Sequence, residues 1–343
     1  MKKLLNVLYV TKPDCYLALE NETVCVQNEG AVLLRLPLLN LEGIVTFGHA
    51  GASPALMGEC ARRGVDLVFL TASGRFLARI VGESRGNVTL RREQYRTADD
   101  EARSCAIASG FLLGKLFNSK WILERAAREY PLRLDAEMLK AASAQLSAAA
   151  KQLDSCETLE QLRGTEGGAA VVYFRAFDQL ILNQKDVFRF EERNRRPPTD
   201  PINALLSFGY TLLARDCAAA LEGVGLDAYV GFLHRDRPGR ASLALDLMEE
   251  LRAVMIDRFV LTLINRKELG AGDFITQENG AVLLKDDSRK AFLAAWQSRK
   301  QETLSHPFLE EKIPWGLVPH AQALLLARYL RGDLDAYPPF LWK

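Results

Sequence analysis

The sequence predicts an α+β protein with a small β-rich, sandwich-like domain at residues 1–95 and a larger all-α domain at residues 96–343. Before residue 95, short runs rich in Val, Leu and Tyr alternate with turn residues, a pattern typical of strands. From Asp99 onward the apolar residues recur with the period of an amphipathic helix. Because strands and helices are segregated along the chain, two separate domains are favoured over alternating βαβ units.

Short strands separated by turns account for most of the N-terminal region. The turns are predicted at Asn21-Glu22 and at Asn28-Glu29-Gly30. A helix is predicted from Pro54 to about Arg63, because Ser53 is a favoured cap and proline suits the first helical position. The predicted strands span residues 3–10, 15–19, 23–27, 31–36, 41–47, 65–70 and 74–81.

Helices account for most of the remaining chain. A loop is predicted at Gln184–Pro201, and Glu278-Asn279-Gly280 predicts a hairpin within residues 274–285. The predicted helices span residues 100–118, 119–130, 135–153, 159–182, 202–221, 242–266, 287–303 and 315–331.

Composition limits the classes of function. The chain has 343 residues and a net charge of +1, so any basic surface for nucleic acid must be local. Its six cysteines include no Cys-x-x-Cys pair, so their spacing fits neither a zinc site nor a disulfide framework. Scattered thiols of this kind are typical of proteins in a reducing compartment. No apolar run reaches the roughly 18 residues of a membrane span. We therefore expect a cytoplasmic protein without a membrane partner.

A loop histidine followed by an acidic helix is the first candidate site. His234 precedes a helix on which Asp246, Glu249 and Glu250 fall within about 100° of arc. Ser242 is the expected N-cap. Carboxylates with an imidazole suit Mn²⁺ or Mg²⁺, although the same pattern also fits a solvated helix face beside an unrelated histidine. The facing arc predicts core positions at Leu247, Met248, Leu251, Val254 and Met255.

A second candidate lies around Glu166. Glu166, Ala169, Ala170 and Tyr173 share one face of a predicted helix. The small residues around Glu166 leave room for a phosphate backbone or for a second helix. A close helix–helix contact with an exposed glutamate is the alternative interpretation. The Gln184–Pro201 loop is rich in arginine and is a further candidate for phosphate contacts.

Three motifs in this order resemble a known family. They are Gly-Thr-Glu166-Gly-Gly-Ala-Ala-Val-Val-Tyr-Phe, Asn203-Ala-Leu-Leu-Ser-Phe-Gly-Tyr210, and Gly231-Phe-Leu-His234 leading to Asp246-Leu-Met-Glu249-Glu250-Leu-Arg252. The set resembles the CRISPR-associated adaptation integrase, the first of the two universal Cas proteins, over essentially the whole chain. The wording Asp-Leu-Met-Glu-Glu-Leu-Arg resembles the branch found in subtype I-C systems.

The resemblance implies a metal-dependent DNA endonuclease and integrase. Such a protein inserts short foreign DNA fragments as spacers into a CRISPR array by transesterification. It implies that Glu166, His234 and Glu249 are catalytic ligands of Mn²⁺ or Mg²⁺, with Asp246 as an auxiliary acid. Some relatives have Asp at the position of Glu249. The implied DNA or phosphate contacts are Tyr173, Arg235, Arg237, Arg240 and Arg252.

The resemblance also implies partners. They are double-stranded DNA, its single-stranded ends and the CRISPR repeat, a second copy of the chain, and the second universal Cas protein, which is small and ferredoxin-like. We expect residues 1–95 to provide the dimer surface, because an antiparallel sheet can leave an apolar face uncovered. Residues 96–343 would then form the catalytic domain. Two alternatives remain open from the residues alone. They are a helical metal-dependent hydrolase of a non-nucleic-acid substrate and a DNA-binding scaffold without catalysis.

Overall fold

The structure is a computed structural model that describes residues 6–72, 76–82 and 87–343. The chain divides into two compact units. Unit 1 comprises Met1–Gly86, Leu284–Glu302 and Pro314–Leu317, and unit 2 comprises the remaining segments Asn87–Leu283, Thr303–Ile313 and Val318–Lys343. The division therefore falls before α2 (Val88–Ala98), a helix that the sequence did not indicate, rather than near residue 95. Part of the predicted helical domain, including α9 (Asp286–Gln301), belongs to unit 1.

Unit 1 contains two four-stranded sheets. The first has the order β1-β5-β7-β8, in which β1, β5 and β7 are parallel and β8 is antiparallel. Their bounds are β1 Val7–Val10, β5 Gly43–Phe47, β7 Asp66–Leu70 and β8 Phe76–Ile80. The second sheet has the order β4-β3-β2-β6. Its bounds are β2 Tyr16–Glu20, β3 Thr23–Asn28, β4 Ala31–Pro37 and β6 Gly51–Ala52.

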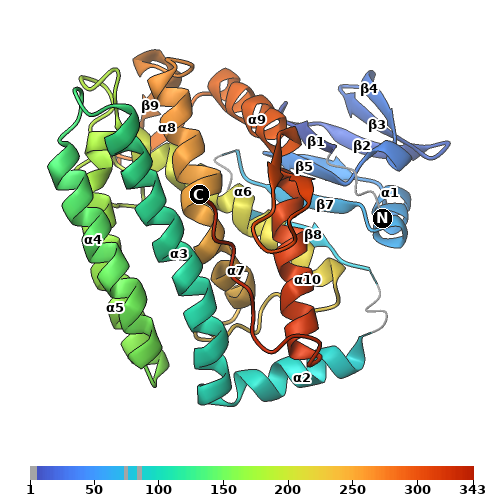
Figure 1. The fold of residues 1–343 in the computed structure, drawn as a ribbon. Helices are drawn as coiled ribbons and strands as arrows, with labels where there is room; N and C mark the ends of the chain where they lie inside the picture. Colours follow the sequence, from blue (N-terminus) through green and yellow to red (C-terminus); the bar gives the residue numbers. More distant parts are fainter. Residues whose placement is uncertain (1–5, 73–75, 83–86) are drawn as a thin grey trace. The chain divides into compact units, whose positions relative to one another are not determined.

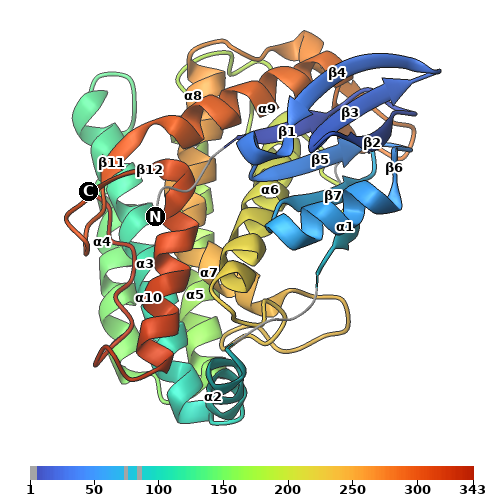
Figure 2. The ribbon, with the colours of Figure 1, turned by 90° about the vertical axis from the view of Figure 1, so that its right-hand side faces the viewer.

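The predicted strands agree with these bounds to within a few residues, except that residues 3–5 and 74–75 lie outside the described part of the chain. One buried cluster joins both sheets and α1 (Pro54–Arg63), with Leu17, Ile44, Leu56 and Leu67 among its members. Helix α1 packs against β2 and β7 (Figure 2). Its predicted cap is confirmed, because Ser53 Oγ accepts a hydrogen bond from Leu56 N at 3.2 Å.

Unit 2 is built around α3 (Glu101–Glu129), which packs against α4 (Ala136–Gln152), α5 (Leu159–Phe177) and α7 (Ser242–Arg252) (Figure 1). The sequence predicted two helices here, at 100–118 and 119–130, and that prediction is wrong. The polar pair Asn118-Ser119 lies inside one continuous helix. The Asn118 amide donates to Glu250 O at 2.7 Å and to Phe340 O at 2.8 Å, so tertiary bonds satisfy a side chain that otherwise favours a helix end.

Helix α7 continues through an irregular turn. Ala253–Asp257 form a π-helical turn that leads into α8 (Arg258–Asn265), where the sequence predicted one regular helix. Ser242 is not the cap of α7: it is the first helical residue, and its hydroxyl donates to Arg235 O at 3.2 Å. The predicted cap is therefore wrong, because a tertiary bond to the preceding loop takes that hydroxyl.

The other elements of unit 2 include α6 (Pro201–Gly223) and α10 (Val318–Leu330). The predicted hairpin is present as β9 (Phe274–Thr276) and β10 (Val282–Leu284), and a second short pair is formed by β11 (Thr303–Ser305) and β12 (Lys312–Pro314). Within the described residues α6 alone is long and apolar enough to pass a composition test for a membrane span. Since 56% of that apolar window is buried inside the protein, α6 has the character of a core helix.

Candidate functional site

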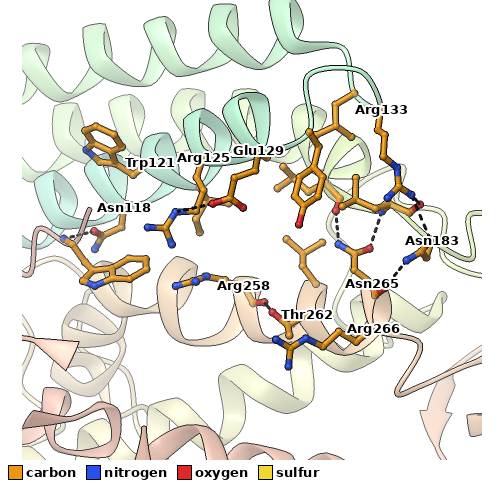
Figure 3. Close-up of a pocket in the computed structure, with 18 of the residues that line it drawn as sticks. Asn118, Trp121, Arg125, Glu129, Arg133, Asn183, Arg258, Thr262, Asn265 and Arg266 are labelled. Atoms are coloured by element: carbon orange, nitrogen blue, oxygen red, sulfur yellow. Dashed lines mark hydrogen bonds and ion pairs between the residues drawn. The ribbon is translucent and has the colours of Figure 1, made fainter. Parts of the chain in front are cut away.

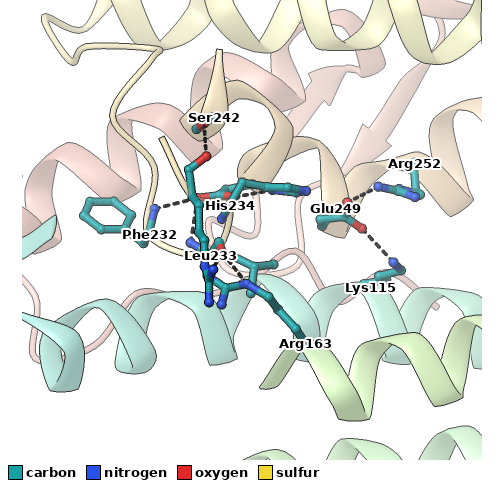
Figure 4. A network of polar contacts seen from close by, with 10 residues as sticks. Lys115, Arg163, Phe232, Leu233, His234, Ser242, Glu249 and Arg252 are labelled. Atoms are coloured by element: carbon teal, nitrogen blue, oxygen red, sulfur yellow. Dashed lines mark hydrogen bonds and ion pairs between the residues drawn. The ribbon is translucent and has the colours of Figure 1, made fainter. Parts of the chain in front are cut away.

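Three helices of unit 2 bring two carboxylates to one ammonium group. Glu166 projects from α5, Glu249 from α7 and Lys115 from α3. The Lys115 Nζ lies 2.7 Å from Glu249 Oε2 (Figure 4). It also forms an ion pair with Glu166 Oε1. Two of the three ligands expected from the sequence, 83 residues apart in the chain, therefore meet at a single positive charge.

Glu249 is held in its ionised form. Burial raises the pKa of this carboxyl, but Arg252, Lys115 and His234 outweigh burial and lower the pKa to about 2. Arg252 contributes a direct ion pair one helical turn further along α7. Near neutral pH, Glu249 is therefore a buried carboxylate, which is a strong oxygen ligand for a hard cation.

His234 is oriented by Asp246. The imidazole Nδ1 lies 2.6 Å from Asp246 Oδ1, and Asp246 is fully buried. The same carboxylate accepts hydrogen bonds from the backbone N–H groups of Phe232, Leu233 and His234 at 2.7, 2.9 and 3.0 Å. Because a carboxylate only accepts, the proton of a neutral imidazole lies on Nδ1, and Nε2 keeps its lone pair for a metal or a substrate.

Helix α5 also fixes the histidine loop. The guanidinium of Arg163 donates to Leu233 O through Nε at 2.9 Å and through a terminal nitrogen at 2.6 Å (Figure 4). Gly231 is required in this loop, because a Cβ there would lie 2.8 Å from Asp246 Oδ2 and 2.8 Å from Ser242 Cβ. The helix that carries Glu166 thus also positions the backbone before His234.

The donor set fits a divalent cation. Two carboxylates and one imidazole nitrogen are ligand types that Mn²⁺ and Mg²⁺ accept, and the Asp246–His234 bond resembles the carboxylate support common behind metal-bound histidines. Among the residues that the structure describes, no three such groups already lie close enough together to bind one ion. The Lys115 ammonium lies between the two carboxylates instead. His234 lies in the loop that leads into α7, the helix that carries Glu249, and both residues belong to the polar network drawn in Figure 4.

Tyr173 and Arg252 are committed to a buried network. The Tyr173 hydroxyl donates to Asp257 Oδ2 at 3.0 Å, and the Tyr210 hydroxyl donates to Asp257 Oδ1 at 2.5 Å. The Arg252 guanidinium lies 5.3 Å from the centre of the Tyr210 ring while it pairs with Glu249. Tyr173 is 4% exposed and its hydroxyl is bonded to Asp257, so this side chain is packed inside unit 2, and its phosphate contact stays a prediction.

The three acids of α7 do not form one acidic face. Asp246, Glu249 and Glu250 are all buried, so a solvated face is excluded. Glu250 lies away from the other two: Tyr337 Oη donates to its Oε1, and Phe340 N donates to its Oε2 at 2.7 Å. Burial raises the pKa of Glu250 to about 7 against these hydrogen bonds. The five predicted core positions on the same helix segment are buried, as expected.

The arginines after His234 form part of a basic cluster. Arg235 and Arg237 are exposed, and Arg240 is partly buried. Burial lowers the pKa of Arg240, and the positive charges of Arg237, Arg195 and Arg196 lower it further. The last two residues come from the arginine-rich loop, so two segments far apart in the sequence contribute to one positively charged region.

Lys115 and Arg163 were not predicted. Lys115 lies on the buried face of α3, and its neighbours one turn away include Phe111 and Leu112, which are fully buried. The sequence feature that could have identified Lys115 as a site residue is its position among the apolar residues of α3. It was hidden because lysine is common on amphipathic helices, where it normally reaches solvent.

A separate cavity of about 420 Å³ lies between α3 and α8. Arg125 and Arg258 point into it from opposite walls (Figure 3). Its lining also includes Arg133, Arg266 and Lys343, together with the aromatic side chains of Trp121, Tyr130 and Trp342. None of the predicted metal ligands lines this cavity.

Comparison with known proteins decides the family. The model of the family described as CRISPR associated protein Cas1 matches residues 8–298. The chain is 49% identical over 343 residues to the CRISPR-associated endonuclease Cas1 1 of Chlorobaculum tepidum, with all of both chains covered. It is 50% identical over 347 residues to the CRISPR-associated endonuclease Cas1 2 of Rhodospirillum rubrum, again with full coverage of both. The chain belongs to the Cas1 family.

Solved structures support the Cas1 fold. A CAS1 protein from Thermotoga maritima superimposes with a TM-score of 0.83 at 20% identity and covers 97% of this chain and 99% of its own. A casposase bound to integration product gives a TM-score of 0.84 at 23% identity, with 98% and 93% covered. The predicted fold class and the predicted family are therefore confirmed. The I-C subtype remains a prediction.

Proposed function

We propose that this Cas1 protein is a divalent-metal-dependent DNA endonuclease and integrase that inserts short foreign DNA fragments into a CRISPR array by transesterification. The observation that carries the proposal is that Glu166 and Glu249, from two different helices, both contact the Lys115 ammonium. His234 lies in the loop that leads into the helix of Glu249. In this proposal Glu166, Glu249 and the Nε2 of His234 hold Mn²⁺ or Mg²⁺. The bound cation would stabilise charge on the phosphate and assist the attacking hydroxyl.

The residues around the ligands have supporting roles. Asp246 keeps the proton of His234 on Nδ1 and so leaves Nε2 available. Arg252 and the burial of Glu249 fix the direction of that carboxylate. Tyr173 holds α5 against the turn after α7 through its hydrogen bond to Asp257. These contacts restrict the motion of the side chains before DNA binds, and this reduces the entropy cost of positioning them when DNA binds.

Two basic regions of unit 2 support a DNA substrate. Arg235, Arg237 and Arg240 extend from the histidine loop, next to the metal ligand. The cavity between α3 and α8 combines arginines with tryptophans, a combination that suits phosphates together with unpaired bases. The whole chain has a net charge of only +1, so such local regions must supply the attraction.

The experiment compares DNA cleavage and strand transfer by the wild type, Glu166→Gln, Glu249→Gln and His234→Ala. We expect activity with Mn²⁺ or Mg²⁺, loss in EDTA, and a loss of at least about 100-fold in each variant. Matched controls are Glu160→Gln, an exposed acid on α5, and His49→Ala, an exposed histidine of unit 1. Retained activity in folded His234→Ala protein would refute the proposed metal site.

We also propose a homodimer formed through unit 1. The edge strand β4 exposes Val32, Leu33 and Leu34 at 40, 47 and 39%, an apolar edge that a monomer would leave open. Light scattering after size exclusion should report a dimer for the wild type and a monomer for Leu33→Asp. Leu39→Asp, which changes a 74% exposed leucine outside β4, should leave the dimer intact. A monomeric wild type would contradict this assignment.

A second protein partner is the remaining part of the proposal. A solved assembly titled Cas6-RT-Cas1–Cas2 complex contains a chain that matches 98% of this one with a TM-score of 0.81 at 20% identity, over 36% of its own length. We propose that this protein assembles with its own Cas2, the small second universal Cas protein. Co-purification of the two chains as one complex tests this, and separate elution at micromolar concentrations would contradict it.

The alternatives considered from the sequence have less support. Relatives that match the full chain at about half identity are named endonucleases, which favours a nuclease over a hydrolase of small molecules. The two acids and the oriented histidine are present, which favours catalysis over a scaffold without chemistry. DNA binding that persists in EDTA, with no cleavage under any divalent metal, would reverse the second choice.

A further inference from the structure

Lys115 occupies an unusual place for a lysine. Its side chain is only 8% exposed, on the face of α3 that also carries the buried residues Leu112 and Leu116. Burying an ammonium group is unfavourable unless opposite charges compensate it. Its two ion pairs, with Glu166 and Glu249, supply that compensation.

The two glutamates need a cation between them. Glu249 is 5% exposed and Glu166 is 27% exposed, so water screens their mutual repulsion only in part. An ammonium and a divalent cation are attracted by the same carboxylate oxygens but repel each other. With Nζ at 2.7 Å from Glu249 Oε2, Lys115 lies where a metal bound to that oxygen would have to approach. The Lys115 ammonium must therefore move away from the two carboxylates before a divalent cation can bind them.

We propose that Lys115 is a resident counter-ion that a divalent cation displaces from Glu166 and Glu249. In the metal-free protein Lys115 holds the two acids together and prevents their repulsion from opening α5 away from α7. When the cation binds, the ammonium leaves the acids, and the flexible stem of lysine permits this without movement of α3. The assignment of these acids as metal ligands rests on the proposed function, whereas the exchange is a separate claim.

Chemical labelling of the wild-type protein tests the exchange without any activity assay. Reductive methylation with isotopic formaldehyde, read by mass spectrometry, reports how accessible each amine is. We expect Lys115 to react slowly without metal and several-fold faster in saturating Mn²⁺. Lys120, on the same helix, 27% exposed and paired with Glu124 at 3.5 Å, is the internal control and should not change. Lys115 labelling that is unchanged or slower while Mn²⁺ binds would overturn the proposal.

The variant Lys115→Met gives a second readout. Removing the ammonium leaves two uncompensated acids, so the metal-free variant should have a lower melting temperature than the wild type. Mn²⁺ no longer has to displace a charge, so its affinity, measured by calorimetry, should rise by about tenfold or more, and the thermal shift on adding Mn²⁺ should be larger. Lys120→Met should match the wild type in both. An affinity equal to or weaker than that of the wild type would overturn the exchange.

The outcomes separate this claim from the proposed function. Mn²⁺ binding that Glu249→Gln abolishes, together with constant Lys115 labelling, would refute the exchange and leave the metal site standing. Absence of Mn²⁺ binding in the wild type would refute both. If Lys115→Met does not fold without metal, the labelling of the wild type still decides.

Discussion

At the scale of single residues, neighbouring acids on α7 have opposite properties because their surroundings differ. Glu249 faces Arg252, Lys115 and His234, and its pKa is lowered to about 2. Glu250 is buried among groups that include Tyr337 and Gln322, and burial raises its pKa to about 7. Sequence spacing placed both acids on one arc of the helix. It could not predict the charges that other helices bring to each of them.

Glu250 should make stability depend on pH. Between the ordinary value near 4.5 and about 7, the folded protein keeps a proton that the unfolded chain has lost. Stability from this group is therefore present below pH 4.5 and falls by about 1.4 kcal/mol for each pH unit up to 7. Denaturant unfolding at pH 5, 6, 7 and 8 measures this decline, which Glu250→Gln should remove.

The matched control for this prediction is Glu160→Gln, which changes an exposed acid and should keep the wild-type pH profile. The difference between the wild type and Glu250→Gln isolates the one carboxyl from other titrating groups. If the free energy of unfolding of the wild type and that of Glu250→Gln changed in parallel with pH, Glu250 would not titrate in this range.

At the scale of elements, the close approach of α3 to α7 is what assembles the site. A Cβ at Gly114 would lie 2.6 Å from Glu250 Cβ, so only glycine permits this helix contact. Gly114 directly precedes Lys115, and Glu250 directly follows Glu249. The motifs located α5, the histidine loop and α7 along the chain, although the predicted cap of α7 and its continuation as one regular helix were wrong. The motifs did not indicate that α3 belongs to the site, because α3 contributes only Gly114, which has no side chain, and the single lysine Lys115.

Gly114→Ala should therefore separate α3 from α7. Overpacking at such a contact costs about 1–3 kcal/mol and outweighs the preference of a helix for alanine. We expect a lower free energy of unfolding and a loss of Mn²⁺-dependent DNA cleavage. Gly164→Ala is the control, because a Cβ there meets nothing within 4 Å, and it should be neutral or stabilising. A stable, fully active Gly114→Ala protein would contradict the proposed role of this contact.

At the scale of the whole molecule, sequence reasoning recovered the fold class and the family but not the course of the chain between its two units. The return of α9 to unit 1 follows from contacts of high sequence separation, which periodicity does not report. The same limit applies to the cavity between α3 and α8. Its four arginines come from two stretches of the chain, residues 125–133 and 258–266, and each one alone has the character of a solvated charge.

The basic cavity should contribute to DNA affinity through phosphates. We expect Arg266→Ala, which removes an exposed arginine of its lining, to weaken binding of different DNA sequences to the same degree. The slope of log affinity against log salt should become shallower by about 0.7–0.9. Fluorescence anisotropy across a salt series measures both quantities. Arg128→Ala, an exposed α3 residue outside the cavity, should leave the slope unchanged, and equal slopes for both variants would exclude the cavity as a DNA contact.

The proposed metal site can be observed directly in a crystal of the protein that is soaked in Mn²⁺ and measured at a wavelength where manganese scatters anomalously. We expect one strong anomalous peak at about 2.0–2.3 Å from a carboxylate oxygen of Glu166, a carboxylate oxygen of Glu249 and the Nε2 of His234. A peak that touches other residues, or none at saturating Mn²⁺, would contradict it.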